Sequence, residues 1–138
     1  MKKVLVLAPH TDDGELGCGG TVARLLEEGS EVHFAVFSTC AESLPAGFPA
    51  DELKTEFLSA MESYGIPAER IAIFDFPVRH FPTHRQDILE EMVRLNRRIA
   101  PDLVFAPSLH DVHQDHHTIA EEAIRAFKHT SILGYEEP

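Results

Sequence analysis

The sequence predicts an α/β fold in which one doubly wound, parallel sheet lies between two layers of helices. Three observations support this prediction. Short apolar runs alternate with amphipathic helical patterns over the whole chain, no repeat or linker interrupts the alternation, and 138 residues are about one domain's worth. Strands that are joined through helices pair in parallel through right-handed crossovers. We therefore expect a single Rossmann-like, three-layer domain over residues 1–138.

Each element has its own signal in the sequence. Residues 4–8 are all apolar, as in a buried parallel strand. Apolar residues at helical spacing after Leu16 predict a helix that ends at Gly29, because glycine commonly terminates helices. The remaining elements are bounded mostly by Gly or Pro. Strands are expected at 32–38, 71–74, 103–106 and 131–135. Helices are expected at 49–65, from a capping-box pattern at Thr83 and Gln86 to Ile99, and at a segment that buries Ile119 to Phe127.

Composition narrows the classes of function. No apolar run approaches the ~20 residues of a membrane span, and none has the form of a secretory signal. The 12 basic and 23 acidic residues give a formal net charge of −11, which argues against nucleic acid as a partner. Cys18 and Cys40 are too few for a disulfide framework, so we expect a cytoplasmic chain with reduced thiols.

The expected strand order is 3-2-1-4-5. In such a sheet the chain reverses direction between the first and fourth strands, and ligands bind beyond the carboxyl ends of these strands. The loop after the first strand carries His10, Asp12 and Asp13, and the loop after the fourth carries His110, Asp111, His113, Asp115 and His116. The sequence therefore predicts that two loops about 100 residues apart form one site.

The residues of these loops are of the types that bind a catalytic metal ion. Two neutral imidazoles and one carboxylate, with a fourth position left open for water, form the ligand set of a hydrolytic zinc site. His10, Asp13 and His116 can supply this set. Zinc would lower the pKa of bound water to about 7 and polarise a carbonyl group. Because such sites accept several divalent ions, Fe²⁺ or another metal is the alternative to Zn²⁺.

Three neighbouring residues are candidates for acid–base chemistry. Asp12, adjacent to a ligand, is placed to take a proton from the attacking water. His113, one helical turn before His116, is placed to stabilise an oxyanion or to protonate a leaving amine when it is itself protonated. Asp115 can hold the His113 imidazole in one tautomer. Asp111 is a further candidate, either to position a ligand or to bind sugar hydroxyls.

A purely structural interpretation of these residues is the alternative. Adjacent acids at the end of a strand are often helix N-caps, and a histidine near a helix start is commonly exposed without a role. The clustering of His and Asp in both loops favours the metal site. The segment Gly17-Cys18-Gly19-Gly20 lacks G-x-G-x-x-G spacing, so close packing of helix on sheet explains these glycines better than a bound dinucleotide.

At these residues the sequence resembles the PIG-L/LmbE family of zinc-dependent N-acetylglucosaminyl deacetylases. The family's first motif is His-Pro-Asp-Asp followed by a glycine-rich helix start, and this chain has His10-Thr11-Asp12-Asp13 followed by 17–20. The second motif, H-x-D-H, is matched by His113-Gln114-Asp115-His116. Thr11 replaces the family's usual proline. The resemblance extends from Lys3 to about Glu136.

The resemblance implies roles for the matched residues. His10, Asp13 and His116 would be the metal ligands, Asp12 the general base, and His113 the electrophilic or acid histidine with Asp115 behind it. Arg79, in the loop after the third strand, resembles the family's sugar-contacting arginine. Family members commonly continue with a further strand and helix that wall the substrate pocket, so we expect a short or C-terminally truncated member. Trimers or hexamers, frequent in the family, are the expected oligomers.

Three functions remain open at this point. The first is removal of the acetyl group from an N-acetylglucosamine-type amino sugar or its conjugate. The second is binding of metal or sugar without turnover, by a truncated relative. The third, a nucleotide-binding module, is disfavoured by the glycine spacing. Phosphoester hydrolysis at two metals would need more carboxylates than the two loops offer.

Overall fold

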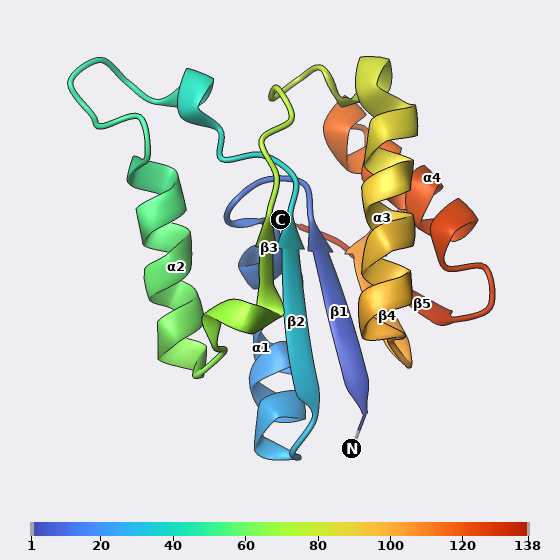
Figure 1. Cartoon of the computed structure of the whole chain (residues 1–138). Helices are drawn as coiled ribbons and strands as arrows, with labels where there is room; N and C mark the ends of the chain where they lie inside the picture. The colour runs from blue at the N-terminus through green and yellow to red at the C-terminus, as the bar shows by residue number, and fades with distance from the viewer. Residues whose placement is uncertain (1, 138) are drawn as a thin grey trace.

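Five parallel strands form the centre of the structure, a computed structural model that describes residues 2–137 (Figure 1). They are β1 (Lys3–Ala8), β2 (Glu31–Val36), β3 (Ile71–Ile73), β4 (Leu103–Pro107) and β5 (Ser131–Tyr135), in the order β3-β2-β1-β4-β5. All four pairings are parallel. The predicted fold class and strand order are confirmed.

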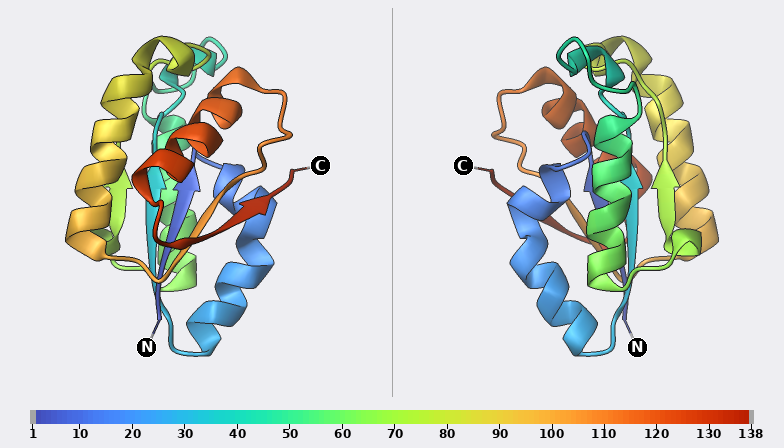
Figure 2. Two further views of the ribbon diagram at one scale, coloured as in Figure 1. Left: turned by 90° about the vertical axis from the view of Figure 1, so that its right-hand side faces the viewer. Right: turned by 90° about the vertical axis from the view of Figure 1, so that its left-hand side faces the viewer.

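Helices cover both faces of the sheet (Figure 2). These helices are α1 (Asp13–Glu27), α2 (Glu52–Tyr64), α3 (Arg85–Ile99) and α4 (Gln114–Ala126), with short 3₁₀ turns at η1 (Ala41–Ser43), η2 (Ala68–Arg70) and η3 (Phe81–His84). Side chains of β1 alternate between two buried clusters: Val4 and Val6 pack with residues of α1 and α2, and Leu5 and Leu7 with residues of α3 and α4. Because β1 is central, it is apolar on both faces, as the sequence pattern indicated.

Two local expectations differ from the structure. Helix α1 begins at Asp13, three residues earlier than Leu16, and has non-helical dihedral angles at Cys18 (φ −143°, ψ 20°). The predicted capping box is wrong: Thr83 lies in η3, where its hydroxyl donates to the carbonyl oxygen of His80 (2.8 Å), and α3 follows with His84 at its N-cap. The Thr83 hydroxyl, predicted to cap the helix, instead forms a hydrogen bond within the 3₁₀ turn that precedes α3.

Close packing accounts for two of the three glycines in the segment 17–20 of α1. A Cβ atom at Gly17 would collide with the ring of Tyr135 on β5, and one at Gly19 would lie 2.8 Å from the hydroxyl of Tyr64 on α2. The Tyr135 hydroxyl in turn donates to the carbonyl oxygen of Leu7 (2.8 Å) near the end of β1. The predicted packing of helix on sheet is thus confirmed at Gly17, whereas Gly19 packs against another helix and Gly20 faces open space.

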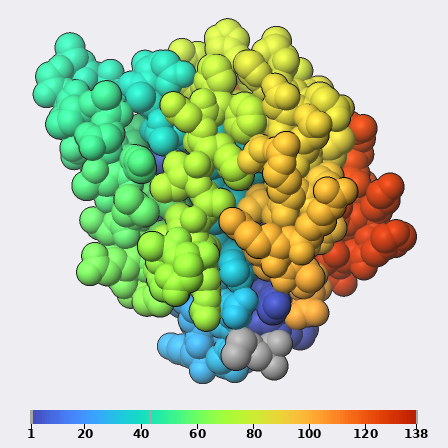
Figure 3. Space-filling model, in the orientation of Figure 1, coloured from blue at the N-terminus to red at the C-terminus, as the bar shows by residue number. Residues whose placement is uncertain are grey.

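The sheet brings two distant loops together at its carboxyl edge. Strands β1 and β4 are neighbours, with Val6 opposite Phe105, so the loops that leave them start side by side. The segment 41–51, between β2 and α2, projects from the body of the molecule on the same side (Figure 3, upper left, blue-green). Within residues 2–137, no helix has both the length and the apolar character required to cross a membrane.

Candidate metal site

The Asp13 carboxylate is the centre of the site. Asp13 is buried at the first position of α1, where the partial positive charge of the helix N-terminus favours an anion. Its Oδ2 atom lies 3.2 Å from Nδ1 of His10 and 3.2 Å from Nε2 of His116, and it accepts the backbone N–H of His10 at 2.7 Å. Three residues from two loops therefore converge on one point, as the topology predicted.

The far nitrogen of each of these two imidazoles is held by a carboxylate. Nε2 of His10 lies 2.9 Å from Oδ2 of Asp115, and Nδ1 of His116 lies 2.8 Å from Oδ2 of Asp111. If these nitrogens carry the ring protons, the lone pairs of His10 Nδ1 and His116 Nε2 point toward Asp13. A histidine ligand that donates its other N–H to a carboxylate is the usual arrangement in metal sites.

The donor set fits a divalent metal ion. In a tetrahedral zinc site with bonds of 2.0–2.2 Å, neighbouring ligand atoms lie about 3.3 Å apart; the two distances of 3.2 Å from Asp13 Oδ2 are close to this value. Among the described residues, two sets of three side chains bring one ligand atom each within 4.8 Å of one another: His10, His113 and His116, and Asp13, His116 and Glu137. Neither set contains all three of His10, Asp13 and His116: His10 belongs to the first, Asp13 to the second and His116 to both.

The same contacts shift the ionisation of these groups in the metal-free protein. Burial by itself lowers the pKa of His116, but its hydrogen bonds and charge pairing with Asp13 and Asp111 outweigh burial and raise it to about 9. Burial raises the pKa of Asp13, but the bonds to His10 and His116 outweigh it and hold the pKa far below its usual range. Without a metal ion, protons therefore neutralise part of the negative charge around Asp13.

Asp115 is fully buried, and its carboxylate has a different partner from the one we expected. It binds His10, and it also accepts the backbone N–H groups of Arg79 (2.6 Å, at Oδ2) and Phe81 (3.1 Å, at Oδ1). The prediction that this carboxylate fixes the His113 tautomer is wrong. The backbone N–H of Asp115 performs that task, donating to Nδ1 of His113 at 3.1 Å.

This backbone hydrogen bond determines which form of His113 faces the site. Because Nδ1 accepts a proton from the Asp115 amide, the neutral ring carries its own proton on Nε2. Burial and the neighbouring His116 and His10 lower the pKa of His113, which further favours the neutral ring. The expectation of a protonated His113 is corrected accordingly: the ring offers a neutral N–H donor.

Asp12 occupies the N-cap position of α1, yet its side chain makes no capping hydrogen bond. It is exposed, and it lines a hollow of about 130 Å³ together with Thr11, Glu15, Leu53, Glu56 and Phe57. A helix cap would need a hydrogen bond from the Asp12 side chain to a backbone N–H of α1, and this bond is absent.

Arg79 and Asp111 differ in their freedom to meet a substrate. Arg79 is exposed and has a left-handed backbone (φ 72°), in the turn whose amide binds Asp115. Both carboxylate oxygens of Asp111 are engaged, one by the backbone N–H of His113 (2.9 Å) and one by His116. Of the two roles considered for Asp111, positioning a ligand has these contacts in its support.

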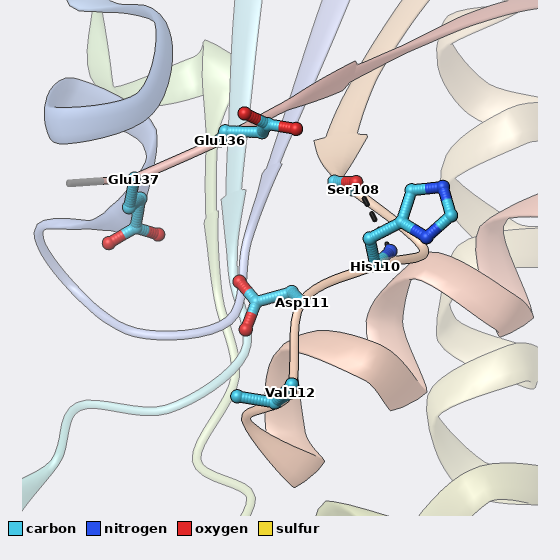
Figure 4. A pocket seen from close by; sticks show the side chains of 6 residues that line it. All are labelled: Ser108, His110, Asp111, Val112, Glu136 and Glu137. Atoms are coloured by element: carbon cyan, nitrogen blue, oxygen red, sulfur yellow. Dashed lines mark hydrogen bonds between the residues drawn. The ribbon is translucent and has the colours of Figure 1, made fainter.

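Glu137, which follows β5, is not among the residues predicted from the sequence. Its Oε1 atom lies 3.7 Å from Nδ1 of His116, and burial and the negative charge of Asp13 raise its pKa to about 7. It lines a pocket of about 270 Å³ with Ser108, His110, Asp111, Val112 and Glu136 (Figure 4). Since β5 neighbours β4 in parallel, the rule that ligands bind beyond carboxyl ends of strands could have pointed to Glu136 and Glu137.

Comparison with known families decides the classification. Residues 5–127 match the PIG-L family model, described as GlcNAc-PI de-N-acetylase. The chain belongs to the PIG-L family. The family match includes both loops of the candidate site.

Individual PIG-L relatives agree with this assignment. The chain is 27% identical to the diacetylchitobiose deacetylase of Thermococcus kodakarensis, over 99% of this chain and 49% of that protein. The structure of the N,N'-diacetylchitobiose deacetylase of Pyrococcus horikoshii has a TM-score of 0.77 at 26% identity, covering 91% of this chain and 49% of the other. Conserved protein TT1542 of Thermus thermophilus has a TM-score of 0.72 at 31% identity, covering 98% and 62%. The chain thus spans about half the length of the two named deacetylases.

Proposed function

We propose that this chain is a metal-dependent hydrolase that removes the acetyl group from an N-acetylglucosamine-type amino sugar or its conjugate. The observation that carries the proposal is the position of the Asp13 carboxylate, 3.2 Å from one nitrogen of His10 and one of His116 whose rings are oriented by Asp115 and Asp111. The similarity to diacetylchitobiose deacetylases supports the type of substrate.

His10, Asp13 and His116 are the residues proposed to hold the metal ion, Zn²⁺ or another divalent ion such as Fe²⁺. When bound, such an ion lowers the pKa of water and polarises a carbonyl group. The chain's own contribution to holding it is twofold. The two rings are fixed by carboxylates, and the α1 N-terminus stabilises the charge of Asp13.

Asp12 is the proposed general base. Its carboxylate is exposed and makes no bond to the backbone of α1, so it can accept a proton from the attacking water. The water oxygen forms a bond to the acetyl carbon, the C–N bond breaks, and the proton held by Asp12 passes to the departing nitrogen. The products are acetate and a free amine.

His113 is proposed to stabilise the negative charge that develops on the acetyl oxygen. The Nδ1 atom of His113 is occupied by the Asp115 amide, so the N–H at Nε2 is the group available to donate to an oxyanion. A donor fixed before the reaction begins needs no reorganisation when the charge appears. Asp115 contributes through its neighbours: its amide orients His113 and its carboxylate orients His10.

Arg79 is the proposed substrate contact at the edge of the site. Its side chain is exposed, and its backbone N–H donates to Asp115, the carboxylate that orients His10, so Arg79 starts from the edge of the site and its guanidinium group is free to bind sugar hydroxyls or a charged aglycone. The unpaired, buried thiols of Cys18 and Cys40 agree with a reducing compartment such as the cytoplasm.

The test is acetate release from diacetylchitobiose and simple N-acetylglucosamine conjugates, measured together with zinc per chain. Asp12→Asn should abolish turnover while the protein keeps its zinc. Asp51→Asn is the matched control, because Asp51 is likewise an exposed helix N-cap without a capping bond, at α2. Turnover that persists in the zinc-loaded Asp12→Asn protein contradicts the assignment. Wild-type protein that binds zinc but releases no acetate supports the alternative, a binding protein without turnover.

A further inference from the structure

Glu137 has a buried oxygen without a partner. Of the described side chains, its Oε1 atom is the one buried oxygen or nitrogen that has no hydrogen bond. The whole side chain is only 16% exposed. A buried, unpaired carboxylate oxygen is costly, so such an atom in a native fold requires an explanation.

No neighbouring group supplies the missing partner. His116 Nδ1 is nearest among the cationic groups, at 3.7 Å from Oε1, but its single N–H is directed to Asp111, whose Oδ2 lies at 2.8 Å. The other close neighbour is the Asp13 carboxylate, which can pair with Glu137 only while Glu137 holds a proton; burial and this contact raise the pKa of Glu137 to about 7, so ionised Glu137 has no donor there. The chain thus places two carboxylates together at a point where its own hydrogen-bond donors are already used.

The ligand atoms of Asp13, His116 and Glu137 all lie within 4.8 Å of one another. Two ligands of one ion lie at most about twice the bond length apart, ~4.4 Å for zinc, so movements of a few tenths of an ångström would let all three reach the same ion. A divalent cation would complete the coordination of Oε1 and remove the repulsion between Asp13 and Glu137.

From this geometry we infer that Glu137 is a fourth protein ligand of the metal ion, supplied by the segment after β5. The inference rests on the proposed function, because it assigns Glu137 to the ion held by His10, Asp13 and His116. It extends the ligand set from one carboxylate to two and from two loops to three, so the water needed for hydrolysis would take a fifth coordination position. Retention of the metal then depends on the docking of β5 as well as on the loops after β1 and β4.

The experiment measures metal binding by the full chain without using activity. Metal-stripped protein is titrated with Zn²⁺ in competition with a chromophoric chelator, and with Co²⁺, whose visible absorption reports on its ligands. Glu137→Gln removes the charge at nearly constant volume. Glu136→Gln is the matched control, because this neighbour lines the same pocket but belongs to neither set of clustered ligand atoms. His116→Ala tests the core of the proposed site, and circular dichroism verifies folding.

Glu137→Gln should weaken zinc binding at least tenfold and change the cobalt spectrum, with Glu136→Gln like wild type. If Glu137→Gln matches wild type in both measurements while His116→Ala loses the metal, the inference is wrong and the proposed function stands. Wild-type protein that takes up neither ion refutes both. If Glu137→Gln fails to fold, Glu137→Asp decides: a shorter carboxylate should retain binding that is weakened, and wild-type affinity with a wild-type spectrum would overturn the inference.

Discussion

Replacement of Asp115 by alanine is expected to be the most damaging single change around the site. The Asp115 side chain has no exposed surface, and its two carboxylate oxygens accept three hydrogen bonds. Two of these come from the backbone amides of Arg79 and Phe81 and one from His10. Removing the carboxylate leaves these donors without a partner and His10 without its orienting contact.

The expected loss of stability follows from these contacts. A buried donor left unsatisfied costs about 1–3 kcal/mol, so the buried Phe81 amide alone gives a loss of about this size in the free energy of unfolding, and the amide of the exposed Arg79 adds a smaller amount. This is a large share of the ~5–15 kcal/mol that stabilises a typical domain. Because His10 also loses its orienting carboxylate, zinc affinity should fall by about 10–100-fold.

Urea unfolding of the metal-free protein separates the two effects, and a zinc competition titration measures the second. Asp12→Ala is the comparison, because Asp12 is exposed and makes no capping bond, so its loss should change stability by no more than about 0.5 kcal/mol. If Asp115→Ala unfolds at the same urea concentration as Asp12→Ala and binds zinc like wild type, the hydrogen-bond network does not act as described.

Three further outcomes are expected. Gly17→Ala should lower the thermal midpoint of unfolding, because its Cβ atom collides with Tyr135, whereas Gly20→Ala, in open space, should not. The metal-free protein should be most stable to urea near pH 4.5 and should lose stability as the pH rises. Glu137, with a pKa raised to about 7, stabilises the fold fully below its unfolded pKa of about 4.5 and loses this contribution as the pH rises through 7. His116, with a pKa raised to about 9, stabilises the fold fully below its unfolded pKa of about 6.5 and loses this contribution as the pH rises through 9. Asp13, with a lowered pKa, stabilises the fold above its unfolded pKa of about 4 and loses this contribution on acidification. A urea midpoint that rises between pH 6.5 and 9 would contradict the pairing of His116 with Asp13. Arg79→Ala should raise KM for the acetylated sugar and leave zinc content unchanged, and an unchanged KM would remove Arg79 from the substrate site.

Much of the architecture was predictable because its signals are local. A few residues are enough to predict the buried strand at 4–8 and the end of the first helix at Gly29. The strand order follows from the alternation of strands and helices along the chain. The meeting of the two loops was predictable for the same reason, since the order of a doubly wound sheet determines which carboxyl ends are neighbours.

The finer contacts were not predictable because they depend on three-dimensional approach rather than on spacing. Asp115 lies two residues from His113, which suggested a side-chain pair, but its carboxylate turns toward His10, 105 positions away. Thr83 has the spacing of a cap, but Pro82 and the 3₁₀ turn give its hydroxyl a nearer acceptor in His80. The position of Glu136 and Glu137 after β5 points to the same edge of the sheet, but the sequence does not indicate which of the two side chains reaches the site.

The bond from the Tyr135 hydroxyl to the carbonyl oxygen of Leu7 joins the sheet's last strand to its first. The same ring fills the space that Gly17 leaves on α1. During synthesis, His10 and Asp13 leave the ribosome more than 100 residues before β5, the strand whose Tyr135 binds the end of β1 next to their loop. A nascent chain therefore has the first two proposed metal ligands long before it has the whole site, and under the inferred role of Glu137 firm binding of an ion would wait until β5 docks.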